Sequence, residues 1–326
     1  ALSSAASDVY KRQVALMPES FVNQATGRCS VQGSKYWFNC NPDGPYHWFK
    51  INWINKSTGY LGREKTAKVR AEAAAKGQEA GLKNILYVHF TMDDNLSLSE
   101  EIKARYRSMY TGVFFKRYIL GLWAMAEGII YDMFDADKHV QKITDFFRCL
   151  KDGGRYVSCD YGTQNATVFL LWNKGNNGKW YCVREYYYSG RAKGKQKTDG
   201  EYADDFEKWL DGVPIRAVIV DPAAASFIAE LGKRGYRVLK ADNDVEDGIR
   251  EVASMLNMGL LVFCDTCINT IMEFGSYIWD EKAAQRGEDR PVKENDHAMD
   301  AVRYFVYTIL SKRTGRVKNK AKHGFD

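Results

Sequence analysis

The stretch GGRYVSCDYGTQNATVFLLW (residues 153–172) decides the fold of this chain, because it holds two apolar runs rich in β-branched and aromatic residues. The next residues, NKGNNGKW, carry the asparagines and glycines that are typical of a hairpin turn. They lead into WYCVREYYY, another run of strand-forming residues. We therefore predict consecutive antiparallel strands in VSCDYG, ATVFLLW and WYCVREYYY.

Strands and helices alternate after this meander. RAVIVDPAAASFIAELGKRG (216–235) contains an apolar strand that ends in Asp221 and then an amphipathic helix. YRVLKA, the helical stretch VEDGIREVASMLNMG and LLVF repeat the alternation, and CINTIMEFGSYIWDEKA precedes a last helix. A meander followed by alternating strands and helices indicates an α/β layered fold.

The half before about residue 124 has mixed character. We expect strands in KYWFNC and NILYVHF, and a helix in LSEEIKARYRSMY (98–110), which opens with a serine and two acids. REKTAKVRAEAAAKGQEAG (63–81) is a charged, alanine-rich helix or a flexible insert.

The composition excludes several classes of protein. With 326 residues, of which 45% are hydrophobic and 13% aromatic, the chain can bury a large core, and we expect two domains. It has no apolar run of about eighteen residues and no signal-peptide pattern, which predicts a soluble, non-secreted protein. The 7 cysteines form no framework, and the CxxC of Cys264 and Cys267 lacks a second ligand pair, so we expect reduced thiols and no zinc.

The net charge of +6 is unevenly distributed. The tail KRTGRVKNKAKH (312–323) holds no acid among its basic residues. The loop GRAKGKQK (190–197) carries Arg191, Lys193, Lys195 and Lys197. Such segments bind phosphate backbones in a salt-sensitive, sequence-independent way, although a solvated tail that maintains solubility explains 312–323 equally well.

The stretch NDHAMDAVRY (295–304) predicts a helix that carries two aspartates and a histidine. Asp296 and Asp300 are four residues apart and share one face, and His297 reaches the same edge. The opposite, core-directed stripe consists of Met299, Val302, Val306 and Ile309. Solvated acids at a helix start explain Asp296 well, but they explain Asp300 poorly, because Asp is a weak helix former in a second turn.

Asp160, Asp221 and Asp300 form a candidate constellation. Asp160 interrupts an apolar strand and Asp221 ends another, and a charged carboxylate in an apolar sheet is unfavourable unless something pairs with it. Mg²⁺ and Mn²⁺ are suitable partners, because clustered aspartates hold two such ions about 3.5–4 Å apart for phosphodiester cleavage. Each acid also has a structural alternative, such as a strand-end turn for Asp160 and a helix cap for Asp221.

From about residue 17 to 312 the sequence resembles the large subunit of tailed-phage DNA packaging terminases. The similar stretches are FNCNPDGPYHWFK, FTMDDNLSLSEE, YTGVFFKRYILGLWAMAEGIIYDMFD, CDYGTQNA, VDPAAASF and NDHAMDAVRY. The resemblance implies a nuclease domain of ribonuclease H-like fold, a mixed sheet flanked by helices, with Asp160, Asp221 and Asp300 as metal-binding acids. It also implies a catalytic role for His297 beside the metals and a fourth acid at Asp296.

The same resemblance implies that the first half is the C-terminal part of a P-loop-type α/β ATPase domain. CNPDGP resembles the segment that couples nucleotide hydrolysis to movement, with Asn41 and Pro42 as its clearest residues. The phosphate loop GxxxxGK[ST] occurs nowhere in the 326 residues, so we expect that only the intact motor, with a portion upstream, binds ATP. The expected organisation is a leader at 1–13, the partial ATPase domain at 14–124, a linker at 125–150, the nuclease domain at 151–312 and a basic tail at 313–326.

The resemblance therefore implies a Mg²⁺- or Mn²⁺-dependent endonuclease that cuts double-stranded DNA during phage genome packaging, with the basic loop 190–197 on the DNA backbone. It also implies the portal protein and the small terminase subunit as partners and a ring homo-oligomer for the intact motor. No membrane is expected, and the location is the cytoplasm of the infected bacterial host, not the mature virion. Two alternatives stay open: a nuclease of the resolvase or transposase type, and a non-catalytic module that docks on portal protein and DNA.

Overall fold

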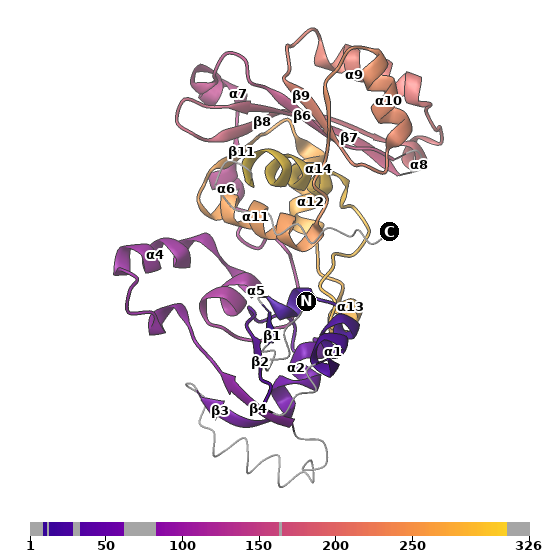
Figure 1. The fold of residues 1–326 in the computed structure, drawn as a ribbon. Helices are drawn as coiled ribbons and strands as arrows, with labels where there is room; N and C mark the ends of the chain where they lie inside the picture. The colour runs from indigo at the N-terminus through magenta and orange to yellow at the C-terminus, as the bar shows by residue number, and fades with distance from the viewer. Residues whose placement is uncertain (1–8, 12, 29–32, 62–82, 163–164, 312–326) are drawn as a thin grey trace, which may run out of the picture. The chain divides into compact units, whose positions relative to one another are not determined.

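The computed structural model describes residues 9–11, 13–28, 33–61, 83–162 and 165–311. Its contacts divide the chain into two units (Figure 1): unit 1 holds residues 1–128 and 279–290, and unit 2 holds residues 129–278 and 291–326. Most of the leader, the alanine-rich stretch and the basic tail lie outside the described residues. None of the helices in the described part of the chain has the length and apolar character of a membrane span.

Unit 2 is built on a mixed sheet of seven strands in the order β10-β9-β6-β7-β8-β11-β5. The central strands β6 (Tyr156–Asp160), β7 (Ala166–Lys174) and β8 (Trp180–Ser189) form the predicted antiparallel meander. The remaining strands run parallel to a neighbour and are β9 (Ala217–Val220), β10 (Val238–Lys240), β11 (Leu261–Cys264) and β5 (Val140–Gln141). The predicted α/β class is confirmed.

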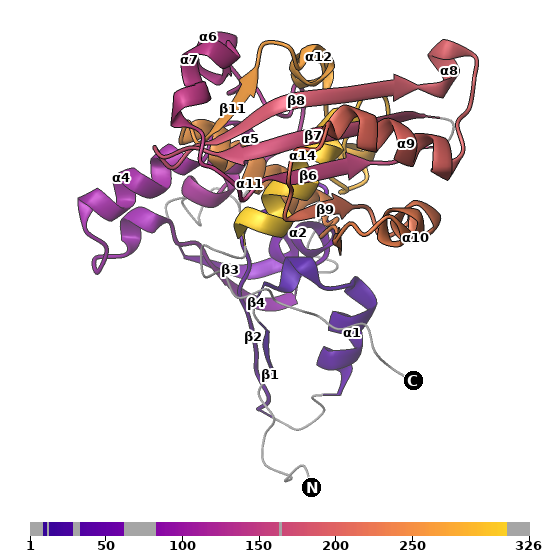
Figure 2. The same ribbon diagram turned by 90° about the horizontal axis from the view of Figure 1, so that it is seen from above.

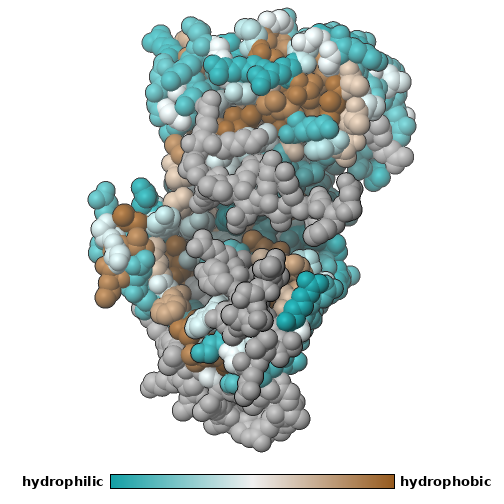
Figure 3. All heavy atoms as spheres, viewed as in Figure 1, coloured by the Kyte–Doolittle hydropathy of each residue, from teal (hydrophilic) through white to brown (hydrophobic). Residues whose placement is uncertain are grey.

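One face of this sheet is covered by α9 (Asp199–Leu210) and α10 (Ala225–Lys233), as Figure 2 shows. Phe206 of α9 and Phe227 of α10 belong to the same buried cluster as Phe169 of β7. In the space-filling view, a band of hydrophobic residues bordered by hydrophilic ones is visible on unit 2 (Figure 3). Every second residue of the central strands points to this face, so Val157 and Cys159 of β6 and Val218 and Val220 of β9 belong to the same core.

The opposite face is covered by α14 (His297–Phe305), which lies on β6 and β7 and contacts α11 (Val245–Asn257) and α12 (Ile268–Ser276). Phe305 stacks on Trp172 with 4.3 Å between the ring centroids. Unit 2 also contains three short helices, α6 (Ala136–His139), α7 (Ile143–Phe146) and α8 (Gly190–Lys193).

The apolar stripe predicted for the last helix is buried at Met299, Val302 and Val306, whereas Ile309 is half-buried. His297 is half-buried, and the remaining residues of α14 are buried as well, including Asp300. The interpretation of its acids as solvated side chains is therefore wrong, because α14 packs between the sheet and two other helices.

Unit 1 contains two separate pairs of parallel strands, β1 (Val9–Lys11) with β2 (Tyr36–Phe38) and β3 (Ser57–Leu61) with β4 (Lys83–Val88). Its helices are α1 (Glu19–Gly27), α2 (Trp48–Asn52), α4 (Glu100–Met109), α5 (Gly112–Phe114) and α13 (Glu281–Gln285). The helix predicted from LSEEIKARYRSMY is confirmed, since Ser99 caps α4 by accepting a hydrogen bond from the Ile102 amide at 3.3 Å.

Residues 279–290 lie within the sequence of the predicted nuclease domain but contact unit 1. Asp289 anchors them through an ion pair with Arg117, whose side chain is 1% exposed. The Arg117 guanidinium also lies 3.0 Å from Asp43 of the CNPDGP stretch and donates two hydrogen bonds to the Ala124 carbonyl. This buried cation therefore holds together three segments that are far apart in the sequence.

Candidate functional site

Asp160 and Asp221 lie at the ends of two adjacent parallel strands. Cys159 of β6 pairs with Val220 of β9, so the two aspartates are the next residues in register. Thr167 holds the chain just after Asp160, because its hydroxyl donates to the Gly162 carbonyl at 2.9 Å and accepts from the Gly162 amide at 3.3 Å. The parallel pairing thus explains why two acids that are distant in the sequence meet at one sheet edge.

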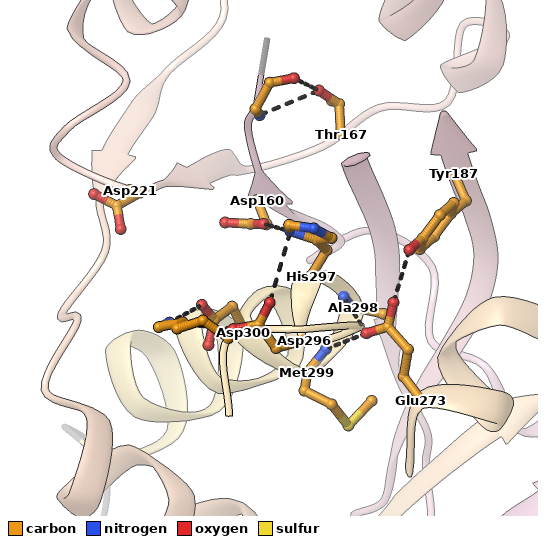
Figure 4. A network of polar contacts seen from close by, with 12 residues as sticks. Asp160, Thr167, Tyr187, Asp221, Glu273, Asp296, His297, Ala298, Met299 and Asp300 are labelled. Atoms are coloured by element: carbon orange, nitrogen blue, oxygen red, sulfur yellow. Dashed lines mark hydrogen bonds and ion pairs between the residues drawn. The ribbon is translucent and has the colours of Figure 1, made fainter. Parts of the chain in front are cut away.

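Helix α14 brings His297 to Asp160 (Figure 4). His297 Nδ1 lies 2.9 Å from Asp160 Oδ2 and 4.0 Å from Asp296 Oδ1. Asp296 is the residue before α14 and is 4% exposed, and Asp300 follows one turn later at 7%. The structure therefore brings Asp160, Asp296, His297 and Asp300 into one cluster.

Burial determines the protonation of this cluster. Desolvation raises the pKa of Asp160 to about 6, although its hydrogen bond with His297 opposes the rise, and the negative charge of Asp300 adds to it. Burial by itself lowers the pKa of His297, but the hydrogen bond and the charge of Asp160 reverse this, and the net shift is upward. The hydrogen bond between the two side chains therefore favours the imidazolium form of His297 beside an ionised Asp160.

Two cations hold Asp300. Its Oδ1 accepts hydrogen bonds from Arg303 Nη2 at 2.9 Å and Nε at 3.3 Å, and its Oδ2 lies 3.5 Å from Lys293 Nζ. Arg303 is 2% exposed and donates further to the carbonyls of Asn243 and Asp244. The Lys293 ammonium also lies 3.2 Å from Asp296 Oδ2, so it bridges two carboxylates of the cluster.

Asp221 is joined to the same helix by Tyr304. The Tyr304 hydroxyl donates to Asp221 Oδ2 at 2.6 Å, and Asp221 Oδ1 accepts from the Ala223 amide at 2.7 Å. Burial raises the pKa of the Tyr304 hydroxyl far above its ordinary value, and the charges of Asp300 and Asp160 raise it further. The phenol therefore stays protonated and serves as a hydrogen-bond donor.

The carboxylate oxygens of this cluster are the type of ligand atom that divalent cations bind. Among the residues that the structure describes, no group of three or more His, Cys, Asp or Glu side chains is arranged to hold a metal ion. Carboxylate oxygens are nevertheless the preferred ligands of Mg²⁺ and Mn²⁺. Asp296 Oδ2 is buried and makes no hydrogen bond, although the Lys293 ammonium is near it. A buried carboxylate oxygen in this state fits a cation-binding role.

The predicted basic loop begins at α8, directly after β8 (Figure 2). Arg191, Lys193 and Lys195 are exposed, and Lys195 Nζ lies 3.8 Å from Glu201. Lys197 is different, because it forms an ion pair with Asp205 and its ammonium lies 4.1 Å from the centre of the Tyr188 ring. The charge of Lys197 is therefore already neutralised by a carboxylate of the protein itself.

The predicted coupling residues Asn41 and Pro42 lie in unit 1, in the loop before α2. The backbone amide of Asn41 donates a hydrogen bond to Gln13 Oε1 at 3.3 Å. The next residue, Asp43, is the partner of the buried Arg117. Within this loop, the ion pair with a buried cation is thus made by Asp43 and not by Asn41 or Pro42.

Four residues of the site were missed by the sequence analysis: Glu273, Lys293, Arg303 and Tyr304. Arg303 and Tyr304 belong to the NDHAMDAVRY stretch and follow Asp300 by three and four residues, a spacing that places them beside it on a helix. Glu273 is a lone acid in the apolar run IMEFG, which is a weaker signal. The sequence carries no comparable sign for Lys293.

The comparisons with known proteins identify the class to which this fold and site belong. No protein-family model matches the chain. It is 26% identical over 250 residues to the large terminase subunit of Escherichia phage T5, an overlap of 73% of this chain and 55% of that protein. The chain thus spans about half the length of this curated relative.

Solved structures give a stronger likeness. The large terminase from a thermophilic bacteriophage is 54% identical, with a TM-score of 0.80 over 93% of this chain and 68% of that chain. A structure of the same thermophilic phage protein in complex with ATP-γ-S is also 54% identical, with a TM-score of 0.79 over 93% of this chain and 70% of that one. The chain belongs to the large terminase subunits of bacteriophages.

Proposed function

We propose that unit 2 is a nuclease that hydrolyses phosphodiester bonds of double-stranded DNA during phage genome packaging. The observation that carries the proposal is the meeting of Asp160, at the end of β6, with the helix that bears His297 and Asp300. Family membership supports it, because the relatives are large terminases. The order β10-β9-β6-β7-β8, with only β7 antiparallel to both of its neighbours, supports a ribonuclease H-like sheet.

Asp160, Asp221 and Asp300 are the proposed ligands of Mg²⁺ or Mn²⁺, with Asp296 as a fourth. A bound pair of such ions supplies Lewis-acid activation of the attacking water and neutralises charge on the phosphate. The surrounding residues orient these carboxylates: Tyr304 holds Asp221, Arg303 holds Asp300, and His297 holds Asp160. An imidazole ordinarily titrates near neutral pH, so His297 can also exchange a proton beside Asp160.

In the proposal, residues 14–124 are the C-terminal part of a motor ATPase domain, and 151–312 form the nuclease domain. Asn41 and Pro42 belong to the segment that couples ATP hydrolysis to movement in the intact motor. Arg191, Lys193 and Lys195 contact the DNA backbone, since exposed cations at one loop suit phosphates. Portal protein and the small terminase subunit are the proposed partners, in the cytoplasm of the infected host.

A non-catalytic docking module is the second candidate. The pairing of Asp300 with Arg303 and Lys293 favours it, because a carboxylate that is already neutralised by two cations can be purely structural. This candidate predicts DNA binding without cleavage, and no affinity of the acid cluster for metal ions.

The deciding experiment is cleavage of supercoiled plasmid by the purified chain with Mg²⁺, with Mn²⁺ and with EDTA. Asp160→Asn and Asp221→Asn keep the shape of each side chain and remove its charge, and Asp152→Asn is the matched control in an exposed loop of unit 2. Metal-dependent cleavage that both site variants lose and the control keeps supports the nuclease. DNA retardation on a gel without cleavage under any ion overturns it in favour of docking.

A further inference from the structure

Glu273 of α12 is a buried carboxylate that contacts the first turn of α14. It is 4% exposed, and its Oε2 accepts hydrogen bonds from the Ala298 amide at 2.7 Å and the Met299 amide at 3.3 Å. Its Oε1 accepts from the Tyr187 hydroxyl at 2.9 Å. Figure 4 shows Glu273 and Tyr187 on one side of the α14 start and Asp160 on the other.

This contact replaces the missing local cap of α14. The first amides of a helix have no partner within the helix, and the residue before the helix usually supplies a side-chain acceptor. Asp296 occupies that position but makes no such hydrogen bond. Glu273 caps the helix from a different element, and its carboxyl oxygen lies at the positive end of the helix dipole. Asp296 is thereby left out of the capping role.

Glu273 is itself held in place by β8. Glu185 of β8 accepts hydrogen bonds from the backbone amides of Asn269 at 3.1 Å and Thr270 at 2.6 Å, which fixes the start of α12. Glu185 and Tyr187 are two residues apart and therefore face the same side of the sheet. Strand β8 thus contacts α12 at two points, through Glu185 and through Tyr187. Glu273 of α12 in turn binds the first turn of α14, so the position of α14 depends on that of α12.

We propose that Glu273 is a positioning residue for the acid cluster. By capping α14 through two backbone amides it sets where Asp296, His297 and Asp300 lie relative to Asp160. The inference rests on the proposed nuclease function. Loss of the cap frays the first turn of α14, which carries His297, while the exposed loop 190–197 is left unchanged. The turnover number therefore falls and the affinity for DNA does not.

The test compares Glu273→Ala and Glu273→Gln with Thr198→Ala. Thr198 caps α9 on the opposite face of the sheet, so Thr198→Ala removes a helix cap without touching α14. We expect Glu273→Ala to lower kcat for plasmid cleavage by about 10- to 100-fold with KM unchanged, because small misplacements of reacting groups have effects of this size. Glu273→Gln, which keeps an acceptor oxygen, retains intermediate activity. Thr198→Ala changes kcat by less than about 2-fold, because a cap on the opposite face affects stability and not placement.

A second readout needs no activity. In the metal-free protein, the amide proton resonances of Ala298 and Met299 move upfield in Glu273→Ala and less in Glu273→Gln, whereas they stay in place in Thr198→Ala. Tyr187→Phe, which removes one hydroxyl, gives a milder change in both readouts if the alanine variant does not fold. Unmoved amide resonances overturn the capping contact, and moved resonances with normal kcat overturn the positioning role. A wild-type chain that cleaves nothing overturns the nuclease proposal, and the amide readout then decides the cap by itself.

Discussion

The hydroxyl of Tyr304 lies 2.6 Å from Asp221 Oδ2, and this hydrogen bond links the acid that follows β9 to the helix that carries Asp300. Tyr304 is 3% exposed and Asp221 is half-buried, so the hydrogen bond is partly shielded from solvent. The position of Asp221 therefore depends on the packing of α14 as well as on its own strand. Asp160, Asp221 and Asp300 are thus all connected through α14, since His297 contacts Asp160 and Tyr304 contacts Asp221.

Tyr304→Phe tests this link. The change removes a partly buried hydrogen bond to a carboxylate, and we expect a loss of about 1–2 kcal/mol in the free energy of unfolding. Plasmid cleavage falls more than stability accounts for, because the Asp221 side chain loses one of the two hydrogen bonds that it accepts from described residues and keeps the one from the Ala223 amide. Urea denaturation and cleavage kinetics measure the two effects. The neighbouring Phe305 is part of the buried core and cannot serve as a control. The matched control is Tyr106→Phe, which removes the same hydroxyl group from an exposed tyrosine of α4.

Gly248 of α11 tests the position of Arg303. A Cβ atom at Gly248 would lie 2.5 Å from Arg303 Cγ and 2.7 Å from Cδ, so alanine displaces the side chain that holds Asp300. We expect Gly248→Ala to destabilise the protein by about 1–3 kcal/mol, as overpacking does. Gly232→Ala in α10 meets nothing within 4 Å, and it is expected to be neutral or stabilising by up to about 1 kcal/mol. Equal melting temperatures for the two variants would contradict the close approach.

The stability of unit 2 should depend on the protonation of Glu273. Burial raises its pKa from 4.5 to about 7, although the hydrogen bonds from Tyr187 and the two helix amides oppose the rise. The folded state then binds this proton more tightly than the unfolded state, so the stabilisation is complete below pH 4.5 and is lost as the pH rises toward 7. We expect the difference in unfolding free energy between wild type and Glu273→Gln to fall by ~1–3 kcal/mol across this range. Denaturation in EDTA at several pH values measures it, and a constant difference refutes the shift.

Arg117 should be essential to unit 1. Removing the cation leaves Asp43 and Asp289 without their shared partner, and losing one side of a buried ion pair costs about 3–5 kcal/mol. Arg117→Met is therefore expected to unfold unit 1 at a much lower urea concentration. Adding Asp289→Asn to this variant recovers part of the lost unfolding free energy, because it removes one of the two carboxylates that have lost their partner. Arg105→Met on exposed α4 is the control and should be nearly neutral.

The basic loop offers a test of DNA contact. We replace Arg191 and Lys193 by Gln. The slope of the logarithm of the DNA-binding constant against the logarithm of the salt concentration is then expected to become shallower by an amount that corresponds to about two phosphate contacts. Lys197→Gln should change the salt dependence little and lower stability instead, because Lys197 is paired with Asp205. Fluorescence anisotropy with labelled duplex DNA at several KCl concentrations separates the two results. An equal effect of all the changes contradicts the distinction.

Local signals explain why much of the fold was predictable. The hairpin residues of NKGNNGKW and the apolar, strand-forming runs around them specify β6, β7 and β8, since turn chemistry and strand propensity act within a few residues. The strand that ends at Asp221 was visible for the same reason. The burial of Asp300 on an enclosed helix was not visible, because it depends on which elements pack around α14.

The sequence by itself determined the meander, the strand and helix alternation, and the family to which the chain belongs, because these features rest on short-range periodicity and on motifs in a fixed order. Only the tertiary structure decided the neighbours of each acid: His297 meets Asp160 across 137 positions, and Glu273 caps α14 across 25. Such contacts depend on strand register and on helix packing, which arise from the whole buried core rather than from any one stretch.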